Sequence, residues 1–387
     1  GETYPFHELT GSGLAWKVAC YMLTLVDDYD YAMELVDLAA FGTIADVAPL
    51  IGENRSIVKR ALRQMRSCWY KREGVKALYD GPLDRITAED IAFKIAPCIN
   101  ASGRLDVRGA DLPLLLLLED RPGIAEFLAE RLTDCNNRRK SIQKEWCNRM
   151  EETALKMIEQ GDKVLVLLAD GAPSGVVGLV AGNLKEKYNR PSIVFAPKQD
   201  SSGKTVWTGS GRSIKGFHLL NALKTCEDFF LAYGGHELAA GMSIPENEEV
   251  LSQLRTRLNQ VAEYLSETDL MPMTYWDTEI TEAELTNSLY EELKSLEPFG
   301  EGVKKPVFKM RMHLLPKRHM LMGADKSHLK LFCENYSAVG FSLADKYIHS
   351  ELPEVIDALG YPCENYFNGK VKQEFMLVDF EPVTENE

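Results

Sequence analysis

Apolar residues recur at helical spacing along the first third of the chain, which predicts a helical N-terminal part. The expected helices are Leu14–Leu25, Tyr31–Ala40, Ser56–Met65 and Ala88–Ile95. Two stretches interrupt the pattern and are predicted to be loops, Gly42–Leu50 and Pro97–Leu105. Farther along, Ile124–Gln160 holds strong helix formers without Pro or Gly, so we expect one helix of about 37 residues that connects two domains.

The second half of the chain alternates between strands and helices and then becomes rich in short strands. Alternating buried strands and helices are typical of an α/β domain. Its strands are expected at Lys163–Ala169, Ser192–Ala196 and Lys204–Gly209, and its helices at Val176–Tyr188, Gly216–Leu223 and Glu248–Leu265. Beyond Thr274, a five-stranded barrel of the oligonucleotide-binding kind is predicted around one helix, Glu282–Leu296. Its strands are expected at Tyr275–Ile280, Val307–His313, His328–Phe332, Ser337–Phe341 and Gln373–Phe380.

These patterns predict an α/β protein of four parts, at residues 1–122, 123–161, 162–268 and 269–387. With 387 residues, the chain is long enough for two or three domains with full cores. The eight cysteines are scattered without zinc spacing, and no apolar run reaches the length of a membrane span. We therefore expect a cytoplasmic protein with reduced thiols and no membrane partner. The first residue is Gly1, without a signal peptide, so we expect the chain to begin partway into a longer protein.

The net charge of −14 argues against nonspecific attraction of the whole molecule to nucleic acid. Two windows depart from this acidic average: Arg55–Lys76 and Val303–Leu331 each hold eight Lys/Arg and a single acid. Such confined basic patches are consistent with a groove that receives a polyanion. The alternative is that both windows are ordinary solvated faces.

The strongest candidate chemistry lies between Thr208 and Ser243, in Gly209–Ser213 and Gly234–Gly241. Both clusters look like phosphate-handling loops, because paired glycines let the backbone approach a ligand. Ser210 and Arg212 would point the same way in a strand, and an Arg fork suits phosphate oxygens. The alternative is a strand end that packs closely on a neighbour. His236 adds a donor that titrates near neutral pH, or it is a structural histidine.

Two residues of the N-terminal part are further candidates. Asp46 lies among small apolar residues, where a buried carboxylate needs a cation, a metal or several N–H donors; the alternative is a turn or helix cap. Arg104, at the end of Asn100–Arg104, is either a phosphate ligand or a surface arginine. One carboxylate cannot hold a catalytic metal, and no nucleophilic triad, P-loop or dinucleotide fingerprint is present.

Six motifs, in this order along the chain, resemble the bacterial RecJ single-strand DNA exonucleases of the DHH phosphoesterase superfamily. They are Leu9–Lys17, Gly42–Arg55, Asn100–Leu105, Gly209–Ser213, Gly234–His236 and Glu297–Gly302. The resemblance covers nearly the whole chain and identifies the four parts as the C-terminal part of a DHH domain, a connector helix, a DHHA1 domain and an oligonucleotide-binding (OB) domain. It implies a 5′→3′ exonuclease that hydrolyses single-stranded DNA with Mn²⁺ or Mg²⁺ in recombination and repair.

The resemblance also implies roles for single residues. Asp46 would be a metal ligand, and Arg104 and His236 would act at the reacting phosphate. Ser210 and Arg212 would bind the 5′-terminal phosphate. Three polar residues of helices, Asn136, Gln143 and Lys187, would line the path of the strand, and Asn100 would contribute to substrate binding. A single-strand-binding protein and a repair helicase are the protein partners that the family implies.

The chain departs from the family pattern at several positions. It has no Asp-His-His tripeptide, so the metal site is expected to be incomplete. Pro173 stands where relatives have an imidazole, Gly182-Asn183 replaces their Ser-Arg, and Val303–Lys305 replaces their Asn-Pro-Glu. These departures leave two alternatives to the exonuclease: a RecJ-like binding scaffold without nuclease activity, and a phosphodiesterase for short oligonucleotides or cyclic dinucleotides.

Overall fold

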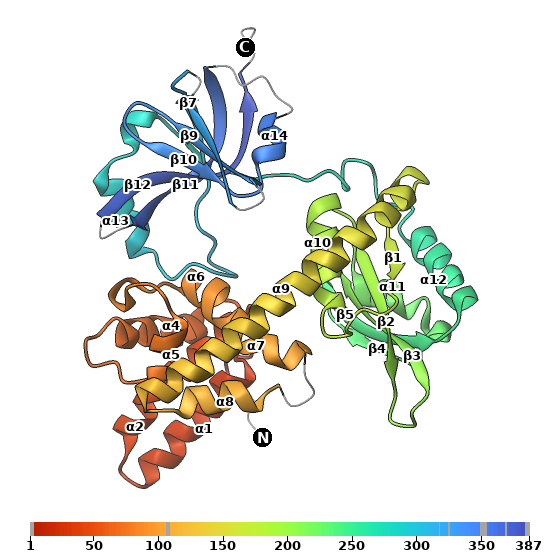
Figure 1. The fold of residues 1–387 in the computed structure, drawn as a ribbon, viewed down its shortest axis with the longest axis horizontal. Coiled ribbons are helices and arrows are strands. Elements are labelled where there is room, and N and C mark those ends of the chain that lie inside the picture. Colours follow the sequence, from red (N-terminus) through yellow and green to blue (C-terminus); the bar gives the residue numbers. More distant parts are fainter. Residues whose placement is uncertain are drawn as a thin grey trace. The chain divides into compact units, whose positions relative to one another are not determined.

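The computed structural model describes residues 4–105, 109–316, 318–323, 326–348, 354–367 and 370–383. The chain folds into two compact units (Figure 1). Unit 1 comprises Gly1–Gln64, Thr87–Glu89 and Met273–Glu387, and unit 2 comprises Met65–Ile86 and Asp90–Pro272.

Unit 1 begins with four helices: α1 (Gly11–Leu25), α2 (Tyr29–Glu34), α3 (Val36–Ala45) and α4 (Gly52–Met65). The helix expected at Tyr31–Ala40 is divided near Leu35. The loop expected to begin at Gly42 is also wrong, because α3 continues through Gly42 to Ala45. A Cβ on Gly42 would lie 2.1 Å from Ser12 Oγ, so this glycine permits α1 and α3 to pack closely. Its role is packing within a helix rather than formation of a turn.

The C-terminal part of unit 1 is a seven-stranded sheet in the described residues, in the order β6-β7-β11-β12-β10-β9-β8. Its strands are β6 (Thr278–Ile280), β7 (Phe308–His313), β8 (His319–Met322), β9 (His328–Phe332), β10 (Ser337–Gly340), β11 (Val355–Phe367) and β12 (Lys370–Pro382), and its helices are η4 (Glu282–Glu284), α13 (Asn287–Ser295) and α14 (Ala344–Ile348). Five of these strands match the expected ones, whereas β8 and the central β11 add to them. The core between strands and α13 is apolar and includes Phe375 and Phe380.

A buried carboxylate stabilises this sheet. Glu374 on β12 is 4% exposed and accepts hydrogen bonds from Ser337 (3.0 Å) and Asn365 (2.9 Å), and it pairs with Lys330. Burial alone would raise the pKa of Glu374, but these bonds outweigh burial and hold the pKa below its usual value. The charged form is therefore the one that the fold requires.

Arg55 joins the two parts of unit 1. Its guanidinium donates to the backbone oxygens of Leu296 (2.6 Å) and Pro298 (2.8 Å), just beyond the C-terminus of α13. The amide of Leu50 donates to the oxygen of Glu301 at 2.7 Å, and Gly300 packs on the Leu50 side chain. The segment that follows α13 is thus fastened to the loop between α3 and α4.

Unit 2 contains a run of short helices and the long helix α9. The helices are α5 (Glu73–Leu78), η1 (Leu83–Arg85), the π-helical turn η2 (Ile91–Ile95), α7 (Ala96–Leu105), α8 (Asp111–Leu118) and α9 (Pro122–Glu159), while α6 (Ala88–Asp90) lies at the division between the units. The loop expected at Pro97–Leu105 is wrong, because α7 covers it. Pro97 closely follows the π-helical turn Ile91–Ile95, and Cys98 and Ala101 are buried on one face.

Helix α9 confirms the expected long helix, with 38 residues and no break. Its first half packs on α5, α7 and α8, where Leu132 and Leu116 share a core. Its second half packs on β1 (Leu165–Leu168) and α10 (Val177–Tyr188) through Trp146 and Met157. One helix therefore fixes the position of α7 relative to the α/β domain within unit 2.

The α/β domain is a five-stranded sheet in the order β1-β2-β3-β5-β4, covered by helices (Figure 1). Its remaining elements are β2 (Ser192–Gln199), β3 (Thr205–Arg212), α11 (Leu219–Lys224), η3 (Glu227–Phe229), β4 (Ala232–Gly235), β5 (Ala239–Pro245) and α12 (Glu248–Val261). Strands β1 and β2 are parallel and the other pairs are antiparallel. Both glycine clusters, expected to be loops, belong to this sheet: the first ends β3 and the second forms the β4–β5 hairpin.

Candidate phosphate-binding site

Strand β3 places Ser210 and Arg212 side by side on one face of the sheet, as their spacing predicts. Both are half-buried, and Arg212 Nη1 donates to Ser210 Oγ at 3.0 Å and to the oxygen of Gly211 at 2.8 Å. A Cβ on Gly178 of α10 would lie 2.9 Å from Ser210 Oγ and 3.3 Å from Arg212 Nη2. The start of α10 therefore lies directly against this pair.

The glycines of β3 have a different role from the expected one. Gly209 and Gly211 face the core, where added Cβ atoms would lie 2.6 Å from Phe195 and 2.8 Å from Leu219. They make room for core side chains, so they do not bring the backbone close to a ligand. The close approach occurs instead at Gly175, where a Cβ would lie 2.1 Å from the backbone oxygen of Arg104.

Three arginines gather at this place. Arg104, in the last turn of α7, donates to the backbone oxygen of Gly175 at 3.3 Å. Burial lowers the pKa of Arg212 and the nearby positive charge of Arg104 lowers it further; the pKa of Arg139 on α9 is lowered by the same two causes. Within the described residues, no carboxylate pairs with any of the three arginines. Such a cluster favours binding of an external anion, because an anion would relieve the mutual repulsion.

Sequence reasoning missed Arg139. Its Nη1 donates to Gln143 Oε1 at 2.7 Å, and its Nε and Nη2 donate to Asn136 Oδ1 at 3.1 and 2.9 Å. Asn136 is only 4% exposed and also donates to Cys98 Sγ at 3.4 Å. Asn136 and Gln143, which were expected to line the path of the DNA strand, thus hold Arg139 from either side. The signal was available, because positions 136, 139 and 143 share one helix face.

The remaining candidates are less closely linked to the cluster. His236 is exposed in the β4–β5 turn, and the pairing of β5 with β3 and β4 places it at the end of the sheet where Arg212 lies. Lys187 is exposed on α10 and pairs with Glu151 of α9. Asn100 is exposed on α7. Asp46 belongs to unit 1 and is exposed at the C-terminus of α3, so its apolar neighbours do not bury it.

The described residues do not form a metal centre. They contain no group of three or more His, Cys, Asp or Glu side chains arranged to hold an ion. A single exposed carboxylate such as Asp46 does not fix a divalent cation, which needs several oxygen or nitrogen ligands. A divalent cation would therefore need ligands beyond those that the described residues bring together.

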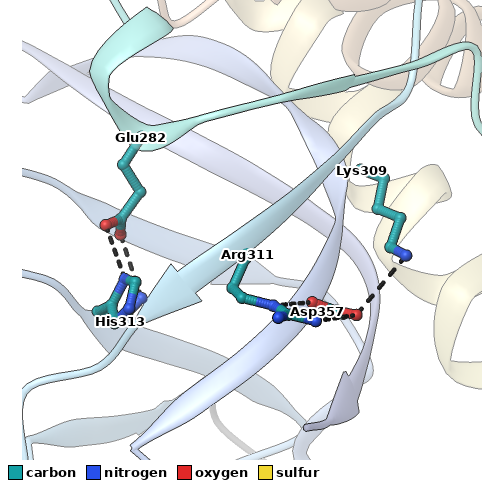
Figure 2. Close-up of polar contacts among 5 residues, drawn as sticks. All are labelled: Glu282, Lys309, Arg311, His313 and Asp357. Atoms are coloured by element: carbon teal, nitrogen blue, oxygen red, sulfur yellow. Dashed lines mark hydrogen bonds and ion pairs between the residues drawn. The ribbon is translucent and has the colours of Figure 1, made fainter. Parts of the chain in front are cut away.

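The second basic window is partly ion-paired in the fold. Lys309 and Arg311 on β7 share Asp357 of β11, at 3.6 and 3.0 Å, and Figure 2 shows both pairs. Lys305 pairs with Glu89 at 2.8 Å, and Lys330 pairs with Glu374. His313 Nδ1 lies 3.0 Å from Glu282, which is also drawn in Figure 2. Lys317 and Asp325 lie outside the described residues. Four of the eight Lys/Arg along Val303–Leu331 are therefore ion-paired, and Lys304, Arg318 and Lys326 have no acidic partner among the described residues.

Comparison with known proteins identifies two of the expected domains, the DHHA1 domain and the OB domain. The family models of the DHHA1 domain and the RecJ OB domain match residues 161–264 and 276–379. RecJ of Bacillus subtilis strain 168, a single-stranded-DNA-specific exonuclease, is 34% identical over 395 residues, which cover 98% of this chain and 47% of the relative. Crystal structures of RecJ from Thermus thermophilus with Mn²⁺ and with Mg²⁺ match at 30% identity, with TM-scores of 0.76 and 0.77. They cover 97% and 98% of this chain and 54% and 57% of theirs.

These matches define the class as DHHA1 proteins that carry an oligonucleotide-binding-type domain. Within that class the chain is similar to the RecJ exonucleases over nearly its whole length, which confirms the resemblance in its motifs. The chain spans about half the length of the curated relatives it matches. No helix of the described residues is long and apolar enough to cross a membrane.

Proposed function

We propose that this chain supplies the phosphate-reading part of a 5′→3′ exonuclease specific for single-stranded DNA. The observation that supports this most is the cluster of Arg104, Arg139 and Arg212, which has no carboxylate partner in the described residues. A terminal phosphate carries more charge than an internal one and offers three oxygens to such a cluster. Recognition of that terminal group would set the 5′ polarity of cleavage.

Each residue then has a distinct role. Arg212 and Ser210 bind the terminal phosphate, and Arg104 binds the phosphate where charge develops in the transition state. Asn136 and Gln143 orient Arg139, as their hydrogen bonds to its guanidinium indicate. His236 stabilises the reacting phosphate from the β4–β5 turn. Lys187 and Asn100 remain predicted contacts to the strand.

Mn²⁺ or Mg²⁺ is the expected cofactor of a RecJ-length protein, and Asp46 would supply one ligand. Because the described residues lack a complete site, the further ligands must come from other residues of such a protein. The cytoplasm as location, and a single-strand-binding protein and a repair helicase as partners, remain predictions that rest on the family resemblance.

The binding experiment compares oligonucleotides with a 5′-phosphate and a 5′-hydroxyl. The wild-type chain should prefer the 5′-phosphate, and Arg212→Ala should lose most of that preference, because a charge-assisted hydrogen bond contributes about 1.5–3 kcal/mol. Arg149→Ala on α9 is the matched control, since Arg149 is exposed and pairs with Glu145. A wild-type chain that binds both oligonucleotides equally would contradict the proposal.

A double-mutant cycle tests the role of Asn136. If Asn136 acts by holding Arg139, then Asn136→Ala should cost nothing further once Arg139 is alanine. If Asn136 contacts DNA independently, the two losses of affinity should add. Nonadditivity is the expected result, because the Asn136 side chain is buried and used by Arg139 and Cys98.

The scaffold without nuclease activity is the second candidate, favoured by Pro173 in place of the family imidazole. A RecJ-length protein that carries this chain separates the two. With Mn²⁺, an exonuclease releases mononucleotides from 5′-phosphorylated single strands, whereas a scaffold binds the same strands and leaves them intact.

A further inference from the structure

The exposed face of α4 carries three cations that the arginine cluster does not include. Lys59, Arg60 and Arg63, which we call the α4 stripe, are all exposed. In the part of the chain that the structure describes, none of them has an acidic partner. The acid of the same helix is already engaged, because Glu53 pairs with Lys17 and accepts a hydrogen bond from Tyr4 at 2.7 Å.

The stripe is held on a well-packed helix. The opposite face of α4 is buried in the core of unit 1 through Asn54, Ile57, Val58, Ala61 and Leu62. Arg55 and Asn54 fasten the first turn, since Asn54 Nδ2 donates to the oxygens of Glu8 (2.7 Å) and Pro49 (3.1 Å). The cations therefore project from a rigid support, which lowers the entropy lost when they bind a ligand.

The placement of unpaired cations distinguishes the two basic windows. In the OB domain, Lys309 and Arg311 share Asp357, and Lys330 pairs with Glu374. The cations there without an acidic partner among the described residues lie in separate segments between strands: Lys304, Arg318 and Lys326. On α4 the positive charge is uncompensated, although the whole chain has a net charge of −14. Uncompensated cations on an acidic protein are where a polyanion would bind most favourably.

The spacing of the stripe suits a nucleic-acid backbone. Residues 59 and 63 are four apart, so their side chains leave the helix about 6 Å apart along its axis. A stacked strand carries a phosphate every ~3.4 Å, so the stripe can reach phosphates one or two nucleotides apart. The exposed neighbour on this face is Ser56, which is also polar.

We propose that the α4 stripe is a second binding site for the sugar–phosphate backbone of single-stranded nucleic acid, independent of the 5′ end. The proposal rests on the proposed function and names a contact to the interior of the strand. An acidic protein segment is the other ligand to be distinguished, because Val18 and Tyr21 of α1, also in unit 1, are exposed apolar side chains that could contact a protein.

The test measures binding of a 5′-hydroxyl oligothymidylate, which lacks the group that the arginine cluster would read. Lys59→Gln/Arg60→Gln/Arg63→Gln removes three cations, so the slope of log affinity against log salt should become shallower by about 2, at 0.7 per cation. Between 50 and 200 mM salt, the wild-type affinity should fall roughly 20-fold more than that of the variant.

A matched control removes three exposed cations of the α/β domain, by Lys198→Gln/Lys204→Gln/Lys224→Gln. The control should keep the wild-type slope, and both variants should keep the wild-type melting temperature. An unchanged slope in the α4 variant overturns the proposal. The proposal is also overturned if the α4 variant no longer binds an acidic peptide but keeps the wild-type slope with the oligonucleotide, because the stripe would then be a protein-docking surface.

The outcome is separable from that of the proposed function. If the wild-type chain shows no preference for the 5′-phosphate, the proposed role of the arginine cluster is contradicted. The salt slope with the 5′-hydroxyl strand still tests the α4 stripe in that case. A variant with unchanged slope but wild-type 5′-phosphate preference would contradict the α4 stripe alone.

Discussion

Gly178 provides a sharp test of the arrangement of the phosphate site. It lies in the first turn of α10, and a Cβ there would approach Ser210 Oγ to 2.9 Å and Arg212 Nη2 to 3.3 Å. Both neighbouring atoms are ends of flexible side chains, so Gly178→Ala should displace them without disturbing the backbone. The fold should survive while the hydrogen bond between Ser210 and Arg212 is distorted.

The expected magnitude follows from that bond. If Arg212 loses its alignment with one phosphate oxygen, one charge-assisted hydrogen bond worth about 1.5–3 kcal/mol is lost. This corresponds to about 10- to 150-fold weaker binding of a 5′-phosphorylated oligonucleotide, because each 1.4 kcal/mol is tenfold. Fluorescence anisotropy with 5′-phosphate and 5′-hydroxyl strands measures the affinity, and thermal unfolding measures stability.

Gly182 is the control, one turn farther along α10. A Cβ at Gly182 would contact Arg212 Cγ at an ordinary distance of 4.0 Å. Gly182→Ala should therefore leave binding unchanged and stabilise the protein by about 0.5–1 kcal/mol, because alanine favours a helix interior over glycine. If Gly178→Ala binds the 5′-phosphate strand as tightly as Gly182→Ala does, then Arg212 does not bind the phosphate in the conformation described.

Three further predictions concern unit 1. Asp357→Asn should remove the ion pairs of Lys309 and Arg311 with this carboxylate, and the salt slope for single-stranded DNA should steepen by at most about 1.4, at 0.7 per cation. An unchanged slope would mean that β7 is remote from the strand. The pKa of Glu374 is depressed in the fold, so the stabilisation that its carboxylate provides should be present above pH ~4.5 and lost as the pH falls through the lower folded pKa. Glu374→Gln should remove this pH dependence of stability, which thermal unfolding between pH 7 and 3 measures. Arg55→Ala should lower stability by about 2 kcal/mol and speed hydrogen exchange in the segment after α13, whereas equal exchange would show that the backbone bonds of Arg55 contribute little.

Strong periodicity predicted the long elements well. Helix α9 and helix α10 were expected within a few residues of where they lie. Strand β11 was missed because Gly360 and Pro362 interrupt its pattern. The structure accommodates Pro362, because β7 pairs with β11 only through Gly360, and Pro362 lies beyond that pairing. Such a position is visible only once the strand order is known.

Glycine was the least informative signal when read locally. At Gly42, Gly209 and Gly211, the missing side chain makes room for a neighbour that is distant in sequence, so none of them marks a loop. Likewise the polar stretch Pro97–Leu105 was predicted to be a loop, although α7 covers it. The motifs were therefore located correctly in the sequence, while the elements that carry them were partly wrong.

In the candidate site, too, the sequence predicted contacts within one element but not contacts between elements. The pairing of Ser210 with Arg212 follows from strand periodicity, and the structure confirms that the two side chains lie together. The contribution of Arg139 depends on the packing of α9 against α7, because burial and then the charge of Arg104 lower its pKa. No local pattern brings those two arginines together. Only the helix spacing of Asn136 to Arg139 was present in the sequence.

Charge counting along the sequence has a similar limit, with a consequence for where nucleic acid binds. A window counts neighbours in the chain, but the acids that neutralise the second basic window, Glu89, Asp357 and Glu374, come from outside it. The exposed cations on α4 have no acidic partner among the described residues, because Glu53 of the same helix pairs with Lys17. Three unpaired cations of the first window share one exposed face of α4, whereas Lys304, Arg318 and Lys326 of the second window lie in separate segments. This concentration of positive charge favours α4 for the proposed backbone contact.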